Sequence, residues 1–369
     1  MPEVPFVDLT ARIAPLRDEL DAAVKRVVDS GWFILGPEVE ALERELATAF
    51  EAPEAVAVAN GTEALQLSLT ALGLGPGDDV VTTSLSAAFT GLAILSAGAR
   101  PVFVDVDPET LNLDPGAVAR AVTPRTRAIL PVHLHGRPAD MDPILACARE
   151  HGIPVVEDAC QAHGARYKGR AAGTLGACGA LSFYPTKNLG ALGDGGAILV
   201  GDGELADRLR RLRNGGQSDR YRHEEPGINS RLDELQAAVL RVGLRHLPAW
   251  TARRRELAAF YRRELEGTGV VLPVERHRVE PVHHLFVVRH PHRDALMAAL
   301  REREIGTLIH YPIPLHLQPA FASLGGAPGA LPVVEKAAGE ILSLPLYPEL
   351  TDGQAEAVVA AVRDATGQL

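Results

Sequence analysis

Short apolar segments alternate with longer amphipathic segments over the first two-thirds of the chain. A run of about four to eight apolar and β-branched residues is typical of a buried strand, whereas apolar positions about 3.6 residues apart indicate a helix. The short runs predict strands over 55–59, 79–84, 101–106, 127–133, 153–159, 180–185 and 196–200. The amphipathic segments predict helices over 62–72, 87–97, 140–151 and 204–212.

This alternation predicts an α/β fold built on a mainly parallel sheet. Parallel strands are joined by helical crossovers, and the helices then cover both faces of the sheet. The last two predicted strands, 180–185 and 196–200, are too close in sequence for such a crossover. We therefore expect a mixed sheet with one antiparallel member.

The pattern changes in a long amphipathic segment over 229–265. We expect it to be helical but broken near Pro248, because a proline inside a helix removes a hydrogen bond and clashes with the preceding turn. A smaller α/β unit begins near Gly267. Its expected elements are a strand within 283–290 and helices around 294–303 and 354–365.

The change of pattern divides the chain into two domains. The large domain would comprise residues 1–247, including the N-terminal segment, and the small C-terminal α/β domain would comprise residues 248–369. No repeat or low-complexity linker separates them, so the long helical segment is expected to bridge the two.

Composition and charge limit the partners of the protein. The chain has 369 residues, of which 46% are hydrophobic, and a formal charge of −10. This charge argues against nucleic acid as a partner. The N-terminal segment lacks the basic start and apolar run of a signal peptide, and no apolar stretch approaches the roughly 20 residues that cross a bilayer. We therefore expect a cytoplasmic protein without a membrane partner.

The cysteines do not point to a metal or a disulfide framework. Cys147, Cys160 and Cys178 are too few and too far apart in sequence for either. We expect small buried thiols in a reducing compartment, and no metal site.

The candidate sites follow strands, because open parallel sheets bind ligands at the carboxyl ends of their strands. Gly61 and Thr62 follow the strand at 55–59 and begin a helix. Gly61 permits a tight turn, and the free N–H groups at a helix start suit a phosphate. The alternative is that Thr62 is only a helix cap.

Asp158 closes an apolar strand in the segment EDACQAHGA, and Gln161 follows it. A carboxylate at a buried strand end needs a cationic or hydrogen-bonding partner. A protonated pyridine nitrogen is one such partner, and an ordinary cap or salt bridge is the alternative.

Lys187 stands in an apolar, glycine-rich stretch, and Ser182 precedes it. The chain has only four lysines, so arginine supplies most of its positive charge. An amine that acts as a nucleophile or Schiff-base partner must lose its proton, which arginine cannot do. The alternative is an ordinary exposed loop lysine.

Asn229 and Arg231 precede the long helical segment, far from the other candidates in sequence. An asparagine at a helix start is usually a cap, so this pair alone indicates little.

These segments together resemble a known family. In order, NGTEALQLSL, EDACQAHGA, SFYPTKNLGALGDGGA and RNGGQSDRYRHEEPGINSRLDELQAAVL are similar to the sugar aminotransferases of the DegT/DnrJ/EryC1/StrS family. Those proteins are pyridoxal-phosphate enzymes of fold type I, the aspartate aminotransferase-like class. The resemblance extends from PFVDL at 5–9 to HYPIPLHLQPAF at 310–321.

The resemblance implies a role for each candidate around pyridoxal 5′-phosphate. Lys187 would form the Schiff base and move the proton, and the cofactor would pass through its pyridoxamine form. Asp158 would pair with the pyridine nitrogen, and Gln161 would lie beside the ring oxygen. The amides of Gly61 and Thr62 and the Ser182 hydroxyl would hold the phosphate.

The resemblance also implies a second subunit and a substrate side. Asn229 would reach the phosphate from the neighbouring subunit of a homodimer, so that the active site is shared. Tyr311, His316 and Arg231 are assigned to the substrate side.

One segment departs from the family pattern. Ala87 occupies the position where many relatives have an aromatic residue that stacks on the cofactor, and Phe89 follows two places later. Either Phe89 stacks after a local shift, or smaller side chains cover the ring. We favour the second interpretation.

The resemblance implies transamination of a nucleotide-linked keto-sugar, with L-glutamate as the expected amino donor. The segment around Asn229 favours a 3-keto-6-deoxy sugar on dTDP, but the sugar, the aminated carbon and the choice of dTDP, UDP or GDP stay open. One alternative is a dehydratase or deoxygenase, whose members typically have histidine in place of Lys187. Another is a non-enzymatic regulator, which predicts loss of the catalytic residues or an added DNA-binding module.

Overall fold

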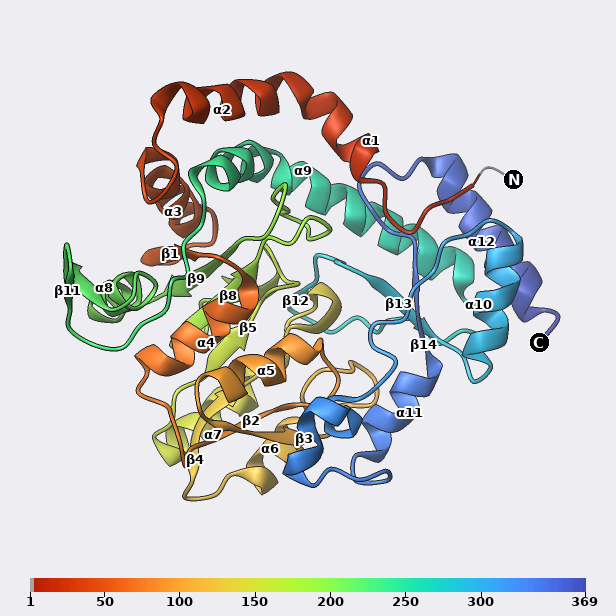
Figure 1. Cartoon of the computed structure of the whole chain (residues 1–369). Helices are drawn as coiled ribbons and strands as arrows, with labels where there is room; N and C mark the ends of the chain where they lie inside the picture. The colour runs from red at the N-terminus through yellow and green to blue at the C-terminus, as the bar shows by residue number, and fades with distance from the viewer. Residues whose placement is uncertain (1–2) are drawn as a thin grey trace.

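The computed structural model describes residues 3–369 (Figure 1). The α-helices are α1 (Leu9–Ile13), α2 (Arg17–Ser30), α3 (Pro37–Ala49), α4 (Gly61–Ala71), α5 (Ala88–Ser96), α6 (Pro115–Ala121), α7 (Met141–His151), α8 (Gly203–Leu212), α9 (Glu234–Leu265), α10 (Arg293–Glu302), α11 (Pro332–Glu340) and α12 (Asp352–Thr366). Short 3-10 helices are η1 (Ala14–Leu16), η2 (Leu134–Gly136), η3 (Leu315–Leu317) and η4 (Pro319–Leu324).

The strands include every one predicted for the first two-thirds of the chain, with ends shifted by a few residues. They are β1 (Glu54–Val58), β2 (Asp79–Thr83), β3 (Arg100–Val104), β4 (Thr126–Leu130), β5 (Val156–Asp158), β6 (Arg166–Tyr167), β7 (Arg170–Ala171), β8 (Cys178–Ser182), β9 (Gly196–Val200), β10 (Gln217–Asp219), β11 (Arg222–His223), β12 (Val279–Glu280), β13 (Phe286–Arg289) and β14 (Ile341–Leu344).

The central sheet is mixed, as the sequence predicts. One part has the order β1-β9-β8-β5, and the other has the order β3-β2-β4. Parallel bridges from Ile129 to Val155 and from Val132 to Asp158 join the two parts side by side. Strand β9 runs antiparallel to both β1 and β8, whereas β5 and β8 are parallel, as are β2, β3 and β4. The antiparallel member is thus β9.

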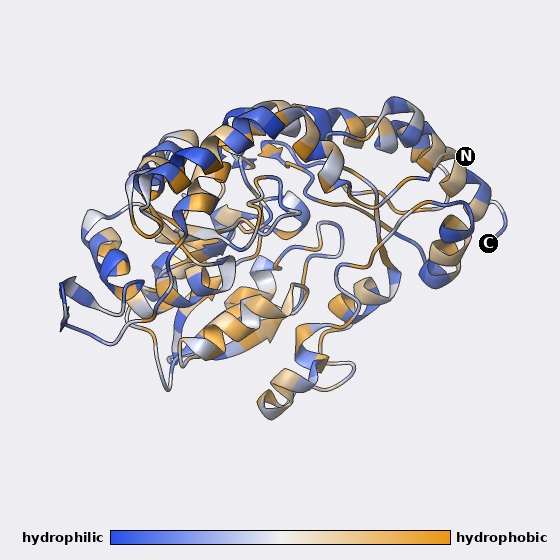
Figure 2. Cartoon of the chain, turned by 45° about the horizontal axis from the view of Figure 1, so that its top comes forward, coloured by the Kyte–Doolittle hydropathy of each residue, from blue (hydrophilic) through white to orange (hydrophobic). Residues whose placement is uncertain are grey.

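Helices bury both faces of this sheet. Val56 and Val58 of β1 belong to a core shared with Leu65 of α4. The alternate residues Ala55 and Ala57 belong to a different core, which includes residues of α3 and α9. Successive strand residues point to opposite faces, so an apolar strand of this kind requires cover on both sides. Figure 2 shows hydrophilic and hydrophobic residues on the same outer helices, as expected for amphipathic helices that cover a sheet.

The predicted break near Pro248 is wrong, because α9 continues through this residue. A proline forfeits one main-chain hydrogen bond and strains the preceding turn. Packing before and after Pro248 offsets this cost. Val239 and Val242 contact residues of α2, and Leu257 and Tyr261 lie in the core of the C-terminal part, residues 248–369. Tertiary contacts therefore keep a helix where the local pattern favours a break.

The C-terminal part contains the strand and the helices expected there, namely β13, α10 and α12. β13 pairs antiparallel with β14. We propose that the boundary between a large and a small domain lies within α9, near residues 247 and 248. The core around β13 and β14 also contains Val4, so the N-terminal segment packs on the C-terminal part.

Within residues 3–369, no helix is both long enough and apolar enough to span a membrane. The hairpin β10–β11 projects from the body of the molecule (Figure 1). It precedes Asn229 in the chain.

Candidate active site

Lys187 lies on the loop between β8 and β9. Its amide donates to the Tyr184 carbonyl at 2.8 Å, which closes a turn. The residue is half-buried, and burial lowers the pKa of its amine, while Cys160 and Asp158 act in the opposite direction. Lys187 is therefore not the freely exposed loop lysine of the alternative interpretation. Its surroundings favour the neutral amine that a nucleophile needs.

Asp158 is a buried carboxylate at the end of β5, 6% exposed. The Thr90 hydroxyl donates to its Oδ2 at 2.8 Å, and the Cys160 amide donates to its Oδ1 at 3.2 Å. Ser86 Oγ lies 2.8 Å from Thr90 Oγ1 and continues this chain of hydrogen bonds. Within residues 3–369, no lysine, arginine or histidine makes a salt bridge with Asp158.

Gln161 is fixed at both ends of its amide. Its Oε1 accepts from the His135 amide at 2.6 Å, and its Nε2 donates to the Tyr311 hydroxyl at 3.1 Å. Burial raises the pKa of Tyr311 to about 12, so the hydroxyl keeps its proton at neutral pH. Gln161 and Tyr311 thus meet although 150 residues separate them in the sequence.

Gly61 begins α4, and its helix cap is Asn60. Asn60 Oδ1 accepts from the Glu63 amide at 2.9 Å, so the interpretation of Thr62 as the cap is wrong. A Cβ on Gly61 would lie 2.7 Å from Ser182 Cβ and 2.9 Å from Cys160 Sγ, closer than real side chains approach. The amides of Gly61 and Thr62 have no acceptor within the part of the chain that the structure describes. They remain available to a phosphate.

Three histidines lie near enough to Lys187 for its charge, in addition to burial, to lower their pKa values: His163, His284 and His310. Burial holds the pKa of His163 at about 3 and that of His310 at about 4, and places the pKa of His284 well below its usual value. His163 is fully buried, and neither of its ring nitrogens has a partner among the described residues. Cationic histidines therefore do not compete with Lys187 for Asp158 at neutral pH.

The three predicted substrate-side residues do not all lie beside the group formed by Lys187, Asp158 and Gln161. Tyr311 does, through Gln161. His316 is buried, with Nδ1 2.7 Å from Ser84 Oγ and Nε2 3.2 Å from Glu335 Oε1, so both of its nitrogens are engaged elsewhere. Arg231 donates to Asn214 Oδ1 at 2.9 Å.

Asn229 lies on the segment before α9. It is exposed, and its backbone pairs with Asn214. The helix that follows begins with Asp233 as its cap residue, so Asn229 is not a helix cap. Phe89, on α5, is 62% exposed, whereas Ala87 is half-buried.

Sequence reasoning missed several groups at this site: Thr90, Cys160, His135 and His284. Thr90 follows β2 at the start of α5, so its position at a strand's carboxyl end was the available signal. The others contact the site through the backbone or from the C-terminal part, and no local pattern marks them.

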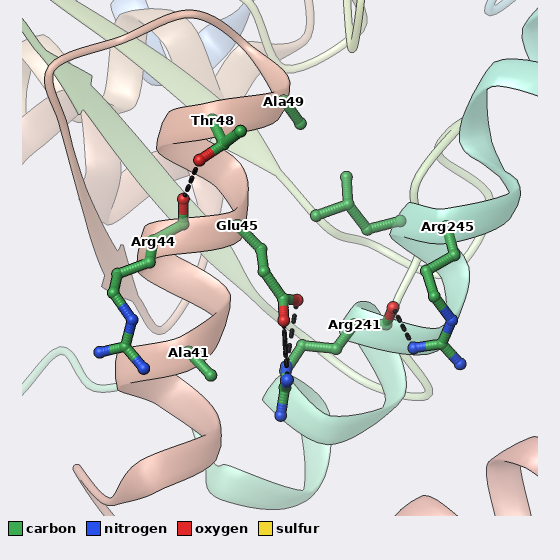
Figure 3. Close-up of a pocket in the computed structure, with 8 residues that line it drawn as sticks. Ala41, Arg44, Glu45, Thr48, Ala49, Arg241 and Arg245 are labelled. Atoms are coloured by element: carbon green, nitrogen blue, oxygen red, sulfur yellow. Dashed lines mark hydrogen bonds and ion pairs between the residues drawn. The ribbon is translucent and has the colours of Figure 1, made fainter.

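A separate pocket of about 460 Å³ lies between α3 and α9 (Figure 3). Arg241 faces Glu45 across it and donates to the Glu45 carboxylate at 2.7 Å, whereas Arg245 donates to the Arg241 carbonyl at 3.1 Å. None of the predicted site residues lines it. This pocket is therefore distinct from the Lys187 site.

Known proteins are similar to this chain over most of its length. The model of the DegT/DnrJ/EryC1/StrS aminotransferase family matches residues 15–363. The chain belongs to this family. The family, together with relatives solved with pyridoxamine phosphate or a ketimine intermediate, implies dependence on pyridoxal phosphate.

Relatives are similar over nearly their full length. A Streptomyces venezuelae protein named dTDP-3-amino-3,4,6-trideoxy-alpha-D-glucose transaminase is 52% identical, over 98% of this chain and 96% of the relative. The erythromycin biosynthesis sensory transduction protein EryC1 of Saccharopolyspora erythraea is 50% identical, over 98% and 99%. The crystal structure of S. venezuelae DesV in complex with a ketimine intermediate superposes with a TM-score of 0.98, at 51% identity and 100% coverage of both chains.

Proposed function

We propose that this protein is a pyridoxal-phosphate-dependent aminotransferase that transfers an amino group to a nucleotide-linked keto-sugar. The observation that supports this most strongly is the Lys187 amine of lowered pKa, close to the buried Asp158. Family membership and full-length similarity to sugar transaminases support the same function.

The residues of the site fit the cofactor. Asp158 is a buried carboxylate without a salt bridge among the described residues, and a protonated pyridine nitrogen would supply its cation. The amides of Gly61 and Thr62 and the hydroxyl of Ser182 would hold the phosphate. Gln161 would lie beside the ring oxygen, with its amide held by Tyr311 and the His135 backbone.

When bound, pyridoxal phosphate supplies an electron sink for moving an amino group between two carbonyl carbons. Lys187 would hold the cofactor and then move a proton between carbon atoms as a neutral amine. Asp158 would keep the ring nitrogen protonated, and Thr90 would orient Asp158. The two half-reactions share one site, so L-glutamate and the sugar would react in alternation.

The expected substrate is a dTDP-linked 3-keto-deoxy sugar. Several similar relatives are named as transaminases of dTDP-3-amino sugars, including one from Micromonospora megalomicea at 48% identity. Tyr311 is the substrate-side residue that the geometry favours, because its hydroxyl lies at the Lys187 site. Arg231 and His316 stay predictions.

We propose a homodimer with a shared active site. Asn229 is exposed, as a residue that serves a neighbouring subunit would be. Large apolar side chains lie exposed, as a dimer surface would require: Trp32, Phe33 and Tyr184. The predicted cytoplasmic location stays a prediction.

The regulatory alternative is less well supported. One relative carries a sensory transduction name and another is named a pleiotropic regulatory protein. This chain nevertheless retains Lys187, Asp158, Gln161 and Ser182, which a regulator without activity would not need. Lys187 likewise argues against the dehydratase alternative.

The test is a two-stage assay on purified protein. After incubation with pyridoxal phosphate, the absorbance of the bound cofactor should shift when L-glutamate is added. The keto-sugars carried on dTDP, UDP and GDP should then be supplied separately, with product mass as the readout. Conversion of the dTDP sugar supports the proposal, whereas a protein that takes up no cofactor contradicts it.

A further inference from the structure

Arg12 of α1 contacts the main chain of Lys187. Its Nη1 donates to the Lys187 carbonyl at 3.1 Å. In the preceding peptide unit, the Lys187 amide closes the turn to Tyr184. A guanidinium from the N-terminal segment thus holds the backbone that carries the reactive amine.

Arg12 is itself fixed by its surroundings. It is 7% exposed, its Nε lies 3.4 Å from Glu349 Oε1, and its guanidinium lies 5.4 Å from the centre of the Trp250 ring. Glu349 belongs to the segment between β14 and α12, and Trp250 belongs to α9. A planar guanidinium that is both paired and stacked loses little freedom in holding one more acceptor.

A second buried arginine supports the residue after Lys187. Arg254 Nη1 donates to backbone carbonyls of the C-terminal part, those of His283, His284 and Leu346. The His284 ring in turn lies 3.2 Å from Asn188 Oδ1. The backbone at 187 is therefore held directly by Arg12, and the side chain at 188 is held indirectly by Arg254.

The N-terminal segment touches the site at a second point. Phe6 stacks on His310, with ring centres 5.6 Å apart, and Val4 forms a bridge with Ile305. His310 precedes Tyr311, which contacts Gln161. Figure 1 shows this segment crossing the C-terminal part before α1 reaches α9. Residues 4–12 thus contact both the Tyr311 segment and the Lys187 loop.

We propose that Arg12 is a positioning residue that holds the Lys187 backbone so that the amine reaches the cofactor in one orientation. This inference rests on the proposed role of Lys187. A misplacement of about 1 Å at a reacting group can slow a reaction about 100-fold. One hydrogen bond to the carbonyl of the reacting residue is therefore expected to affect turnover more than substrate binding.

The first experiment measures the Lys187 loop without cofactor. Arg12→Met keeps the aliphatic stem and removes the donors, while Arg12→Lys keeps a donor. Amide hydrogen exchange over residues 184–191 should quicken about tenfold in Arg12→Met, the change expected for one lost hydrogen bond, and by less in Arg12→Lys. The control is Arg17→Gln, an exposed residue that pairs with Asp21 one turn further along α2, and it should leave the exchange unchanged.

The second experiment measures turnover of the loaded enzyme. Arg12→Met should lower kcat about 5- to 50-fold while KM for the keto-sugar stays within about twofold, and Arg12→Lys should recover part of kcat. A fall in Tm with normal kcat per folded molecule would overturn the positioning role. If Arg12→Met does not fold, Arg12→Gln decides the question, because its shorter side chain stays polar but does not reach the Lys187 carbonyl, and wild-type exchange and kcat in that variant overturn the role.

The two proposals fail in different ways. Unchanged exchange over 184–191 overturns the positioning role alone, because that measurement needs no cofactor. Altered exchange in a protein whose Lys187 takes up no pyridoxal phosphate overturns the proposed function, and the positioning role with it.

Discussion

The side-chain amide of Gln161 lies 3.1 Å from the hydroxyl of Tyr311, 150 residues away in the sequence. Gln161 follows β5 in the large sheet, whereas Tyr311 lies among the segments that pack on β13 and β14. This contact therefore ties the proposed cofactor pocket to the C-terminal part of the molecule. A ligand that moves Tyr311 would also move the group beside the cofactor ring.

Tyr311→Phe should separate the role of this hydroxyl from that of the ring. Gln161 would lose its acceptor, a loss of about 1 kcal/mol for one neutral hydrogen bond. We expect the dissociation constant for pyridoxal phosphate to rise about 3- to 10-fold, measured by fluorescence titration. Tyr347→Phe, a buried tyrosine of the C-terminal core, is the matched control. Equal cofactor affinity in both variants would contradict this assignment.

Thr90→Val should weaken the site by removing the hydroxyl that donates to Asp158. The replacement has nearly the same shape, so the main change is a buried carboxylate oxygen without its donor, at a cost of about 1–3 kcal/mol. Thermal unfolding should show a lower Tm, and cofactor affinity should fall. Thr48→Val, at an exposed position on α3 where the hydroxyl donates to the Arg44 carbonyl of the same helix, is the control. Wild-type stability and affinity in Thr90→Val would exclude a role for this hydrogen bond.

Gly61→Ala should disrupt the proposed phosphate site. The added methyl group would meet Ser182 and Cys160 at less than 3 Å, so α4 would have to move. Overpacking of this kind costs about 1–3 kcal/mol, and the displaced amides should reduce cofactor binding by at least about tenfold. Gly353→Ala on α12 has open space around it and should be neutral or stabilising. If Gly61→Ala binds the cofactor normally, the phosphate lies elsewhere.

Stability should depend on pH through Lys187. The folded state lowers the pKa of this amine from its ordinary value of 10.5. As the pH rises toward 10.5, the folded chain therefore releases this proton before the unfolded chain does. Lys187 therefore destabilises the cofactor-free fold at pH 7, and this penalty shrinks as the pH rises toward 10.5. Lys187→Met should raise Tm at pH 7, with a gain that narrows at higher pH. Lys25→Met, at an exposed position, should change little, and a gain that widens with pH would refute the mechanism.

Several candidate site residues could be predicted from the sequence because they lie at the ends of predicted strands. Gly61, Asp158 and Ser182 stand at or just after the ends of apolar strands, and the parallel arrangement brings such ends to one edge of the sheet. Local patterns are sufficient to mark these positions. The position of Lys187 follows from the same logic, because its loop leaves β8 at that edge.

Other features depend on contacts that no local pattern encodes. The helix through Pro248 survives because both of its ends pack in separate cores. Arg12 and His284 reach the Lys187 loop from segments far away in sequence. His316 matches a substrate-side position, yet Ser84 and Glu335 engage its ring. Such partners are determined by packing and become apparent only in the folded chain.

The most direct test of the central claim is to trap the cofactor on its lysine. The protein would be incubated with pyridoxal phosphate, reduced with borohydride, digested and analysed by peptide mass spectrometry. The other lysines, Lys25, Lys168 and Lys336, provide internal controls in the same sample. We predict a stoichiometric adduct on Lys187 that is lost in Lys187→Met. An adduct spread over the exposed lysines, or none on Lys187, would contradict the proposal that this residue binds the cofactor.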